Sequence, residues 1–354
     1  MTTILPPSYV ALPVLALLAS LFLHAAALRL FPKLGLLDFP HRYGLTRKPI
    51  PYPTGILMVL IFLALFPLLF GLPLTMQSGT LLTGIIALGI VTFVDDRTPL
   101  PAWVRFGVQM LIAVLLFLGG TRIYSLTNPL EQVTAIPLLP LDSLRFTVPY
   151  FGLVPFWSGV FTVVWLLLTI NALNWFDGIP GQVSALSTIG FLIIGLLSVS
   201  GRVNDPALAT VALTLAALSL GALLFDFPPG RVLMGDTGAM FLGLLIGVLT
   251  IYSGGKVATA FLVLGVPLID VFFVVIRRLR RGLSPWKGNA TDQHLHHRLL
   301  KKGWSPRQVI ALTAGLGTAF GVTALFLNTF EKFIAAVILF LVMTTLSIYS
   351  EPRT

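Results

Sequence analysis

Long apolar runs separated by short polar segments dominate this sequence and restrict its possible folds more than any other feature. Eleven such runs can be marked, at residues 9–31, 55–72, 79–94, 103–119, 156–173, 181–200, 206–225, 238–253, 257–276, 308–328 and 332–349. A helix that crosses a bilayer needs about 20 mostly apolar residues, and it satisfies its backbone polar groups internally. The runs therefore predict an all-α polytopic membrane protein with about eleven transmembrane helices.

Few residues are charged, which agrees with lipid as the main solvent of this 354-residue chain. Charged residues make up 10% of it, against about 25% in soluble domains, and 56% of the residues are hydrophobic. The sequence contains no cysteine, so disulfides, thiolate metal sites and thiol nucleophiles are excluded. No polar stretch is long enough for a separate soluble domain, and we expect one membrane domain over residues 1–354.

The basic residues predict how these helices are oriented in the membrane. When the connections are assigned to alternating sides, most of the 23 Lys and Arg residues fall on the side of the loops 32–54 and 277–307. The positive-inside rule makes this side cytoplasmic, which places the N-terminus outside and the C-terminus inside. We therefore expect a multi-pass protein of the cell (inner) membrane. Its net charge of +10 then reflects topology and anionic lipid headgroups rather than nucleic acid.

Most acidic residues are expected at or near the same cytoplasmic face. They are Asp38, Asp95, Asp96, Asp177, Asp226, Asp236, Asp270 and Asp292. A charged group at the bilayer centre costs at least about 2.5–3.5 kcal/mol, and acids at the rim avoid this cost. A transporter of anionic substrates more often places such groups at mid-depth, around broken helices. The pattern therefore favours chemistry at the membrane surface over transport.

Two acidic motifs lie where helices are expected to end or begin. Asp95 and Asp96 end the third run, and adjacent carboxylates repel each other unless a cation such as Mg²⁺ lies nearby. Asp236 precedes the eighth run and Gly238 begins it. Helix N–H groups can face a phosphate there, and small residues let it approach. The structural alternatives are a polar stop at the interface for the first motif and a plain helix N-cap for Asp236.

A third motif ends the fifth run. Asn171, Asn174 and Asp177 are spaced three residues apart, which aligns them near one stripe of a helix. A polar cap, with Gly178 as the residue after the helix, is the structural alternative. Three spaced polar groups exceed what a cap requires, so the pattern favours a functional site.

The last basic loop contains a histidine-rich motif. His294, His296 and His297 are followed directly by Arg298. Because Mg²⁺ prefers oxygen ligands, these imidazoles are better interpreted as phosphate donors or acid–base groups than as its ligands. A transition-metal site and a solvated loop remain alternatives. Asp270 lies within the ninth run, and we expect it to be structural, paired with a neighbouring helix or a loop arginine.

The first loop is basic and stiffened by prolines. Arg47 and Lys48 stand before Pro49 and Pro51, and such a segment can hold a lipid phosphate. An ordinary positive-inside loop is the alternative, and composition alone favours it.

Taken as a set, these motifs resemble the polyprenyl-phosphate N-acetylhexosamine-1-phosphate transferases from about residue 33 to 310. The segment from Thr291 to Gln308 is more similar to the GlcNAc branch than to the muramoyl-pentapeptide branch. Five cytoplasmic loops carry the resemblance and would form the active site: 32–54, 95–102, 174–180, 226–237 and 277–307.

This resemblance implies a reaction. The donor would be a UDP-HexNAc, in particular UDP-GlcNAc, and the acceptor a polyprenyl (undecaprenyl) phosphate. The products would be UMP and a polyprenyl-pyrophosphoryl sugar that starts cell-envelope glycan synthesis. Mg²⁺ is implied as the cofactor, with Mn²⁺ as the alternative ion. Membrane lipids would surround the enzyme, no nucleic acid would be bound, and a homodimer is left open.

The resemblance also implies roles for individual residues. Asp236 would bind Mg²⁺ with help from Asn174, Asp95 would act as a base or orient a phosphate with Asp96 beside it, and Asp177 would help hold the donor. Substrate contacts are implied for a further set: Asn171, Gly178, Gly238, His294, His296, His297, Arg298, Lys48 and Arg47.

Two positions depart from the family pattern. The family often has a second acid three residues after Asp177, close to the uracil, but Pro180 stands there in this chain. The first loop usually carries a histidine and a Gly-Gly pair, where this chain has Thr46 and Thr54-Gly55. The alternatives to the proposed transferase are a muramoyl-pentapeptide transferase, a catalytically inactive lipid-binding relative, and a transporter of anionic substrates.

Overall fold

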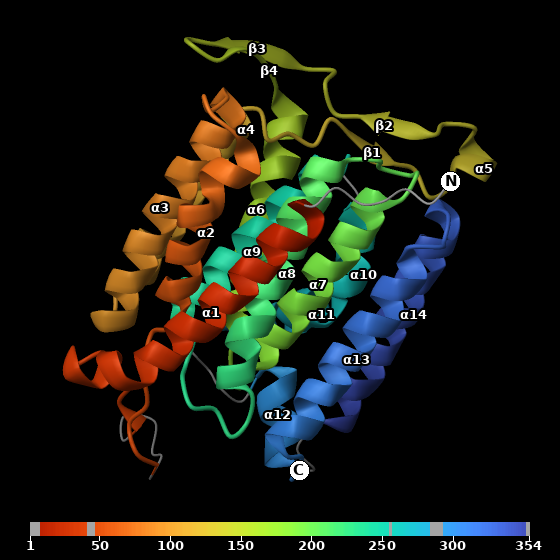
Figure 1. Ribbon diagram of the computed structural model, residues 1–354. Helices are drawn as coiled ribbons and strands as arrows, with labels where there is room; N and C mark the ends of the chain where they lie inside the picture. The colour runs from red at the N-terminus through yellow and green to blue at the C-terminus, as the bar shows by residue number, and fades with distance from the viewer. Residues whose placement is uncertain (1–7, 41–46, 255–256, 284–292, 352–354) are drawn as a thin grey trace.

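The computed structural model describes residues 8–40, 47–254, 257–283 and 293–351. Its long helices run side by side in a bundle (Figure 1). The helices are α1 (Ser8–Lys33), α2 (Gly55–Phe70), α3 (Met76–Arg97), α4 (Ala102–Leu118), α5 (Glu131–Thr134), α6 (Phe156–Phe176), α7 (Gln182–Val199), α8 (Pro206–Asp226), α9 (Gly235–Tyr252), α10 (Val257–Val263), α11 (Gly265–Arg280), α12 (Leu295–Lys301), α13 (Pro306–Ala324) and α14 (Thr329–Tyr349).

Each of the eleven apolar runs is helical in the structure. Within the described ranges, seven helices are long and apolar enough to cross a membrane, or eight if α10 and α11 count as one bent span. The helices α2 and α4 are apolar but shorter. The protein is therefore an all-α polytopic membrane protein, while the number of eleven spans and the orientation stay predictions.

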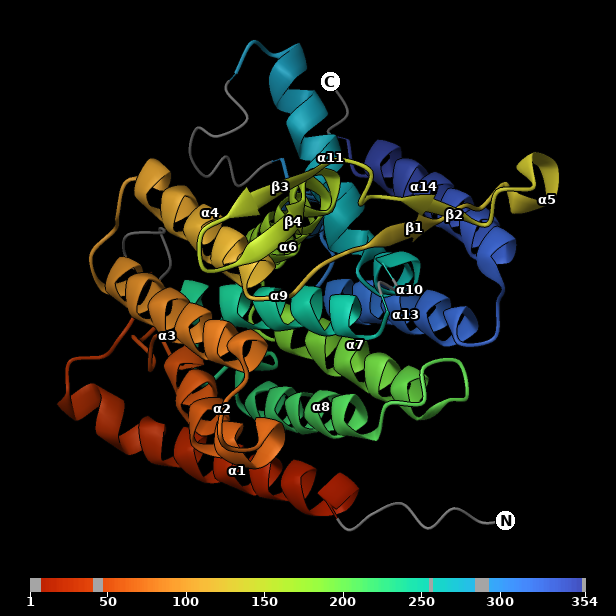
Figure 2. The ribbon, with the colours of Figure 1, turned by 90° about the horizontal axis from the view of Figure 1, so that it is seen from above.

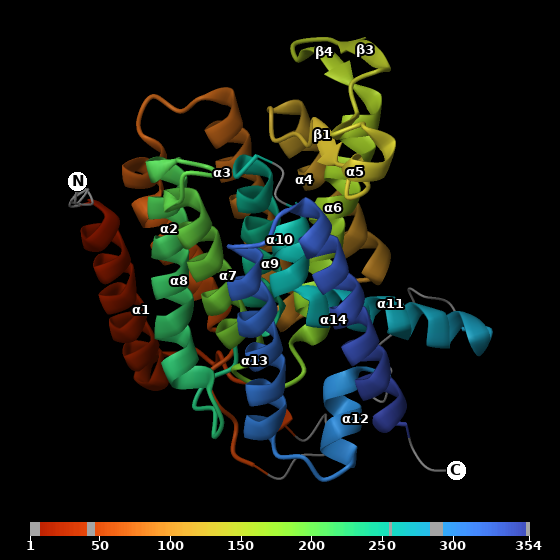
Figure 3. The ribbon, with the colours of Figure 1, turned by 90° about the vertical axis from the view of Figure 1, so that its right-hand side faces the viewer.

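The ninth run differs from the single span expected over 257–276. It is divided into α10 and α11, which are bent by 81° at Leu264. Pro267 has no N–H, and its ring would collide with the carbonyl of Val263 in a continuous helix, which explains the break. After the bend, α11 projects away from the bundle, nearly at right angles to it (Figure 3).

Helix α9 lies at the centre of the bundle, with α6, α3 and α7 around it (Figure 2). Its packing against α6 is close because two glycines face that helix. A Cβ at Gly243 would lie 2.6 Å from the Thr169 carbonyl oxygen, and one at Gly247 would lie 2.5 Å from the Thr169 Oγ1. Small residues allow such contact between membrane helices, and here they bring α9 close against α6 around Thr169.

Two short antiparallel hairpins occupy the stretch 120–155. The strands β1 (Ser125–Thr127) and β2 (Leu138–Pro140) form one, and β3 (Arg145–Val148) and β4 (Gly152–Pro155) form the other. Both lie at the end of the bundle opposite α12 (Figure 1). They are separated from the motifs described below by the length of the helices.

Candidate active site

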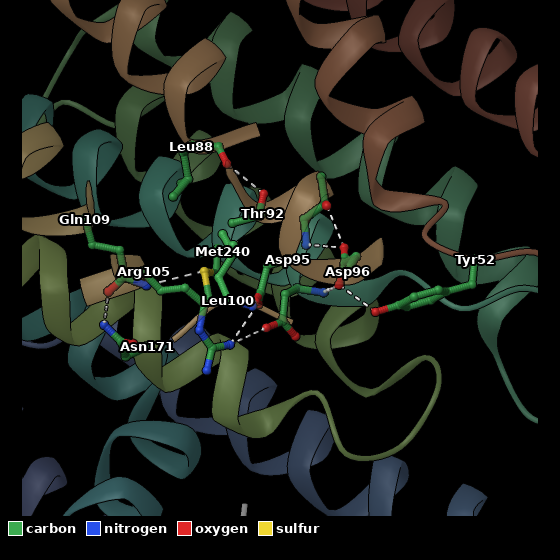
Figure 4. Close-up of polar contacts among 12 residues, drawn as sticks. Tyr52, Leu88, Thr92, Asp95, Asp96, Leu100, Arg105, Gln109, Asn171 and Met240 are labelled. Atoms are coloured by element: carbon green, nitrogen blue, oxygen red, sulfur yellow. Dashed lines mark hydrogen bonds and ion pairs between the residues drawn. The ribbon is translucent and has the colours of Figure 1, made fainter. Parts of the chain in front are cut away.

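Asp96, in the last turn of α3, holds the beginning of α9. Its Oδ1 accepts hydrogen bonds from the Tyr52 hydroxyl at 2.6 Å and the Asp236 N–H at 2.9 Å (Figure 4). Its Oδ2 accepts from the Thr237 N–H at 3.0 Å and the Thr237 hydroxyl at 2.6 Å. These bonds satisfy N–H groups that the first turn of a helix leaves unpaired. Asp96 therefore acts as a positioning residue for the first turn of α9.

Asp236 is not the N-cap of α9. Met234 occupies that position without a side-chain cap, and Asp96 caps the helix from outside. Gly235 is required between them because its φ is +78°, and a Cβ there would lie 2.7 Å from the Asp96 Oδ2. The N-cap alternative for Asp236 is therefore wrong, because its carboxylate does not cap α9.

Arg105, near the start of α4, joins two of the carboxylates. Its Nη1 donates to the Asp95 Oδ2 at 2.9 Å and to the Asp236 Oδ2 at 3.1 Å. The other oxygen of Asp95 accepts from the Leu100 N–H at 2.6 Å. The Asp95 side chain is buried, whereas those of Arg105 and Asp236 are each 32% exposed. One face of the Arg105 and Asp236 pair is therefore accessible to a ligand.

The sequence analysis did not single out Arg105 as a site residue. A usable signal was present, because Arg105 is the only charged residue within the apolar run 103–119. A cation in such a run is costly unless it is paired. The acidic pair just before the run supplies that partner.

Asn171 lies one turn deeper in the bundle than Asn174. Its Nδ2 donates to the Gln109 Oε1 at 2.7 Å and to the Leu167 carbonyl at 2.8 Å. The Gln109 Nε2 in turn donates to the Met240 Sδ at 3.3 Å, and this links α4, α6 and α9 (Figure 4). Both hydrogens of the Asn171 amide are thus engaged within the bundle, and the substrate contact of Asn171 stays a prediction.

The end of α6 brings Asn174 and Asp177 to the acidic residues. Asn174 is buried beside the Asp236 carboxylate, within reach of a side-chain hydrogen bond to it. Asp177 is the C-cap of α6. Burial, followed by the nearby carboxylates of Asp226, Asp236 and Asp96, raises the pKa of Asp177 well above its ordinary value. These acidic groups are crowded closely enough that a cation among them would relieve their repulsion.

Replacing Asp177 with Asn is expected to stabilise the metal-free protein at neutral pH. Because the folded-state pKa lies above the ordinary value of 3.8, the folded protein holds a proton that the unfolded chain releases. Stability therefore falls as the pH rises from about 4, and the substitution removes this loss. Thermal unfolding with EDTA should show a higher melting temperature for D177N at pH 8 and no gain at pH 4. Asp142→Asn at the opposite end is the control; an equal gain at both pH values would contradict the assignment.

The histidine motif is anchored by Asp270 of α11. The Asp270 Oδ2 lies 2.9 Å from the His294 Nδ1, and its Oδ1 accepts from the Leu295 N–H at 3.0 Å. Arg277 of α11 lies 3.8 Å from the same carboxylate. Asp270 therefore makes the structural contacts that the sequence predicted, with an arginine and with the histidine motif that follows α11. Asp292 and Thr291, which belong to the same motif, lie outside the described residues.

His296 meets the end of α6. It is 1% exposed, its ring packs edge-on against Phe176, and neither ring nitrogen has a partner among the described residues. Burial, and to a smaller extent the neighbouring His297 and His294, holds the pKa of His296 well below its ordinary value. His296 is therefore a neutral donor or acceptor rather than a cation. His297 contacts its ring, with 4.2 Å between centroids.

Gly178→Ala is expected to displace His296 and to lower both stability and activity. A Cβ at Gly178 would lie 2.0 Å from the His296 Nε2, far inside van der Waals contact. Overpacking of this kind costs about 1–3 kcal/mol, and thermal unfolding with an activity assay would measure it. Gly79→Ala in the first turn of α3 is a matched control, because nothing lies within 4 Å of its Cβ position. Equal behaviour of the two variants would refute the contact.

The other predicted residues have contacts of their own. Arg47 pairs with Asp38 at 2.5 Å, and Lys48 is exposed. Arg298 is buried, 3.7 Å from Glu351. Tyr52 connects the first loop to Asp96 through its hydroxyl. Gly238 packs closely on Gly55, because a Cβ built at Gly55 would lie 2.4 Å from the Gly238 Cα. Thr46 lies outside the described residues.

The oxygen-rich residues fit a hard divalent ion in their chemistry. In the described ranges, no group of three or more His, Asp or Glu side chains has the geometry of a metal site. Mg²⁺ is usually held by one or two carboxylates together with substrate phosphates and water. The crowded carboxylates of Asp177 and Asp236 match that pattern.

Comparison with known proteins agrees with this arrangement. The sequence profile described as glycosyl transferase family 4 matches residues 79–254, which include α3, α6 and α9. A protein of Bacillus subtilis (strain 168), named probable undecaprenyl-phosphate N-acetylglucosaminyl 1-phosphate transferase, is 27% identical over 96% of this chain and 90% of its own length.

Two further relatives align over a smaller share. The undecaprenyl-phosphate alpha-N-acetylglucosaminyl 1-phosphate transferase of Salmonella typhi is 30% identical over 68% of this chain and 64% of its own. The decaprenyl-phosphate N-acetylglucosaminephosphotransferase of Mycobacterium leprae is 29% identical over 68% of this chain and 61% of its own length. This chain thus spans less than two thirds of the length of these two. Together with the acidic residues gathered at one end of the bundle, the matches show that the chain belongs to the polyprenyl-phosphate N-acetylglucosamine-1-phosphate transferase family.

Proposed function

We propose that this protein transfers GlcNAc-1-phosphate from UDP-GlcNAc to a polyprenyl phosphate at the cytoplasmic face of the cell membrane. The products are UMP and polyprenyl-pyrophosphoryl-GlcNAc, a starting point for cell-envelope glycans. The names of the relatives support the substrates. The observation that carries the proposal is the Arg105 guanidinium held between Asp95 and Asp236 beside the crowded Asp177 carboxylate.

The reaction joins two anions, and the site is built to compensate their charge. An oxygen of the polyprenyl phosphate attacks the β-phosphorus of the donor, the bond from that phosphorus to the bridging oxygen breaks, and UMP leaves with the electron pair. The acceptor needs no strong base, since a phosphate monoester has a second pKa of about 6. Catalysis therefore depends on positioning and on charge stabilisation.

The residues divide this work among them. Asp236, Asn174 and Asp177 would hold Mg²⁺, or Mn²⁺, which supplies charge neutralisation at the transferred phosphoryl group. Arg105 can donate its remaining N–H groups to phosphate oxygens while Asp95 fixes its position. Asp96 keeps the first turn of α9 in place. His296, His297 and Arg298 would contact the sugar or the pyrophosphate. Lys48, together with the Asp38-paired Arg47, would contact the lipid phosphate.

The test is release of UMP by the purified full chain. UDP-GlcNAc, undecaprenyl phosphate and Mg²⁺ should yield UMP and a lipid-linked sugar, and EDTA should abolish both. UDP-MurNAc-pentapeptide, offered in parallel, should give no product. Product from that donor alone would favour the muramoyl branch. Substrate movement across sealed vesicles without UMP release would favour a transporter, and ligand binding without product would indicate an inactive relative.

A further inference from the structure

Asp270, in the second turn of α11, caps helix α12 from outside. It is buried, and its Oδ1 accepts a hydrogen bond at 3.0 Å from the N–H of Leu295, the first residue of α12. The N-cap of α12 is His294, whose own side chain makes no capping bond. Asp270 thus satisfies an N–H group that the first turn of a helix leaves unpaired. The short helix that carries the histidine motif is attached to α11 by this bond.

The second oxygen of Asp270 selects one form of the His294 ring. The Asp270 Oδ2 lies 2.9 Å from the His294 Nδ1. An ionised carboxylate only accepts hydrogen bonds, so Nδ1 has to carry the proton. A neutral imidazole has a single N–H group, and its Nε2 is then a hydrogen-bond acceptor. The contact with Asp270 therefore sets both the orientation of the ring and its tautomer.

The His294 ring lies beside the end of α6. It packs edge-on against Trp175 with 5.9 Å between ring centroids, and it stacks on His296 at 5.5 Å. Trp175 stands between Asn174 and Asp177 in the chain. The His294 side chain is 12% exposed, and within the described ranges its Nε2 has no hydrogen-bond partner. Both ring nitrogens of His296 are fully buried, whereas a ligand can reach the His294 Nε2.

Two arginines farther along α11 hold the residue before His294. Arg277 donates through Nη2 to the Gln293 carbonyl at 2.5 Å, and Arg278 donates through Nε to the Gln293 Oε1 at 2.8 Å. The guanidinium of Arg278 also lies over the Trp175 ring, 5.3 Å from its centroid. Helix α11 therefore supports the backbone on one side of His294 and, through Asp270, the ring itself.

We propose that Asp270 is a positioning residue that acts through His294. It keeps the His294 proton on Nδ1 and leaves Nε2 as the acceptor for a hydroxyl or amide N–H of the bound donor. The assignment rests on the proposed function, because a UDP-HexNAc offers both kinds of group on its sugar. This role exceeds that of an anchor for α12, since the opposite tautomer would present an N–H group to the ligand.

The tautomer can be measured by NMR without turnover. The chain has five histidines, so ¹⁵N-histidine labelling of the detergent-solubilised full chain gives few imidazole signals, and His294→Gln identifies one set by its loss. At about pH 8, where an ordinary imidazole is neutral, two-bond ¹H–¹⁵N correlations should show a protonated Nδ1 and a bare Nε2 for His294. A proton on Nε2, or on both nitrogens, would contradict the proposal.

Asp270→Asn is expected to reverse the tautomer while it keeps both contacts. The Asn oxygen can accept from the Leu295 N–H, and its amide can donate to a bare Nδ1, which moves the proton to Nε2. We expect the two nitrogen signals of His294 to exchange. We also expect kcat/KM for UDP-GlcNAc to fall about 10- to 100-fold, the scale of one lost hydrogen bond in a buried site, with little change in melting temperature.

Ser347→Ala is the matched control on the same helix pair. It removes the 2.9 Å contact between the Ser347 hydroxyl and Arg277 and leaves the Asp270 and His294 pair untouched. Both the tautomer and the kinetics should stay as in the wild type.

The outcomes separate this proposal from the proposed function. A reversed tautomer with wild-type kinetics in D270N would reduce Asp270 to an anchor of α12 and overturn the proposal. If D270N does not fold, His294→Gln gives a second test, because it keeps the bond between Asp270 and α12; wild-type kinetics in H294Q would also overturn the proposal. If the wild type releases no UMP, the transfer reaction fails, while the NMR result still decides whether Asp270 sets the tautomer.

Discussion

Asp236→Asn is expected to reduce UMP release by about 10³-fold, the scale of losing a major electrostatic contact in a transition state. Asn has the same shape but no charge, so it weakens both the proposed metal binding and the contact with Arg105. The fold should persist, because Arg105 keeps its 2.9 Å contact with Asp95 and the backbone N–H of residue 236 keeps its bond to Asp96. Activity with Mg²⁺ and thermal unfolding would be measured on the same preparation.

The control for this variant is Asp142→Asn. Asp142 pairs with Arg145 beside the β3–β4 hairpin, at the other end of the bundle, and its removal should leave UMP release unchanged. Wild-type activity in D236N would exclude Asp236 from metal binding and from catalysis. A loss of folded protein in D236N would instead show a structural role for the carboxylate.

Arg105→Ala is expected to have the second largest effect, a loss of about 10²- to 10³-fold in UMP release. The substitution removes the cation that separates Asp95 from Asp236, and it leaves the buried Asp95 with only the Leu100 N–H. An unpaired buried acceptor also costs about 1–3 kcal/mol of stability. Kinetics and thermal unfolding would therefore both change.

Arg105→Lys separates charge from geometry. A lysine keeps one positive charge but lacks the planar fork that can contact two carboxylates and a phosphate together. We expect its activity to lie between those of the wild type and R105A, with stability close to the wild type. Wild-type kinetics in R105A would show that the guanidinium is only a structural link. Equal losses in R105K and R105A would show that charge alone is insufficient.

The sequence predicted the helices well because their signal is local. A long apolar run between polar residues is readable without knowledge of its neighbours, and all eleven runs are helical. The break at Leu264 was missed although Pro267 marked it, because the run stays apolar on both sides of the bend. The two hairpins carry little signal in the sequence, since strands of three or four residues show almost no periodicity.

The site was predicted in its residue types more than in its contacts. The sequence identified three charges at helix ends, Asp95, Asp96 and Asp236. It did not show that the Asp96 carboxylate caps α9. That role depends on which helix ends meet in space. Arg105 was missed as a candidate site residue for the same reason, since its partner Asp236 lies on another helix and far along the chain.

The four hydrogen bonds to Asp96 have a consequence for how this region moves. They tie the residue before the cis Tyr52–Pro53 bond, the end of α3 and the first turn of α9 into one unit. Thermal fluctuations that shift one of these segments must carry the other two along or break bonds. The position of the Asp236 carboxylate therefore depends on how α3 and α9 are tilted relative to each other. Lipids that change this tilt would also shift Asp236 relative to Arg105 and so change the activity.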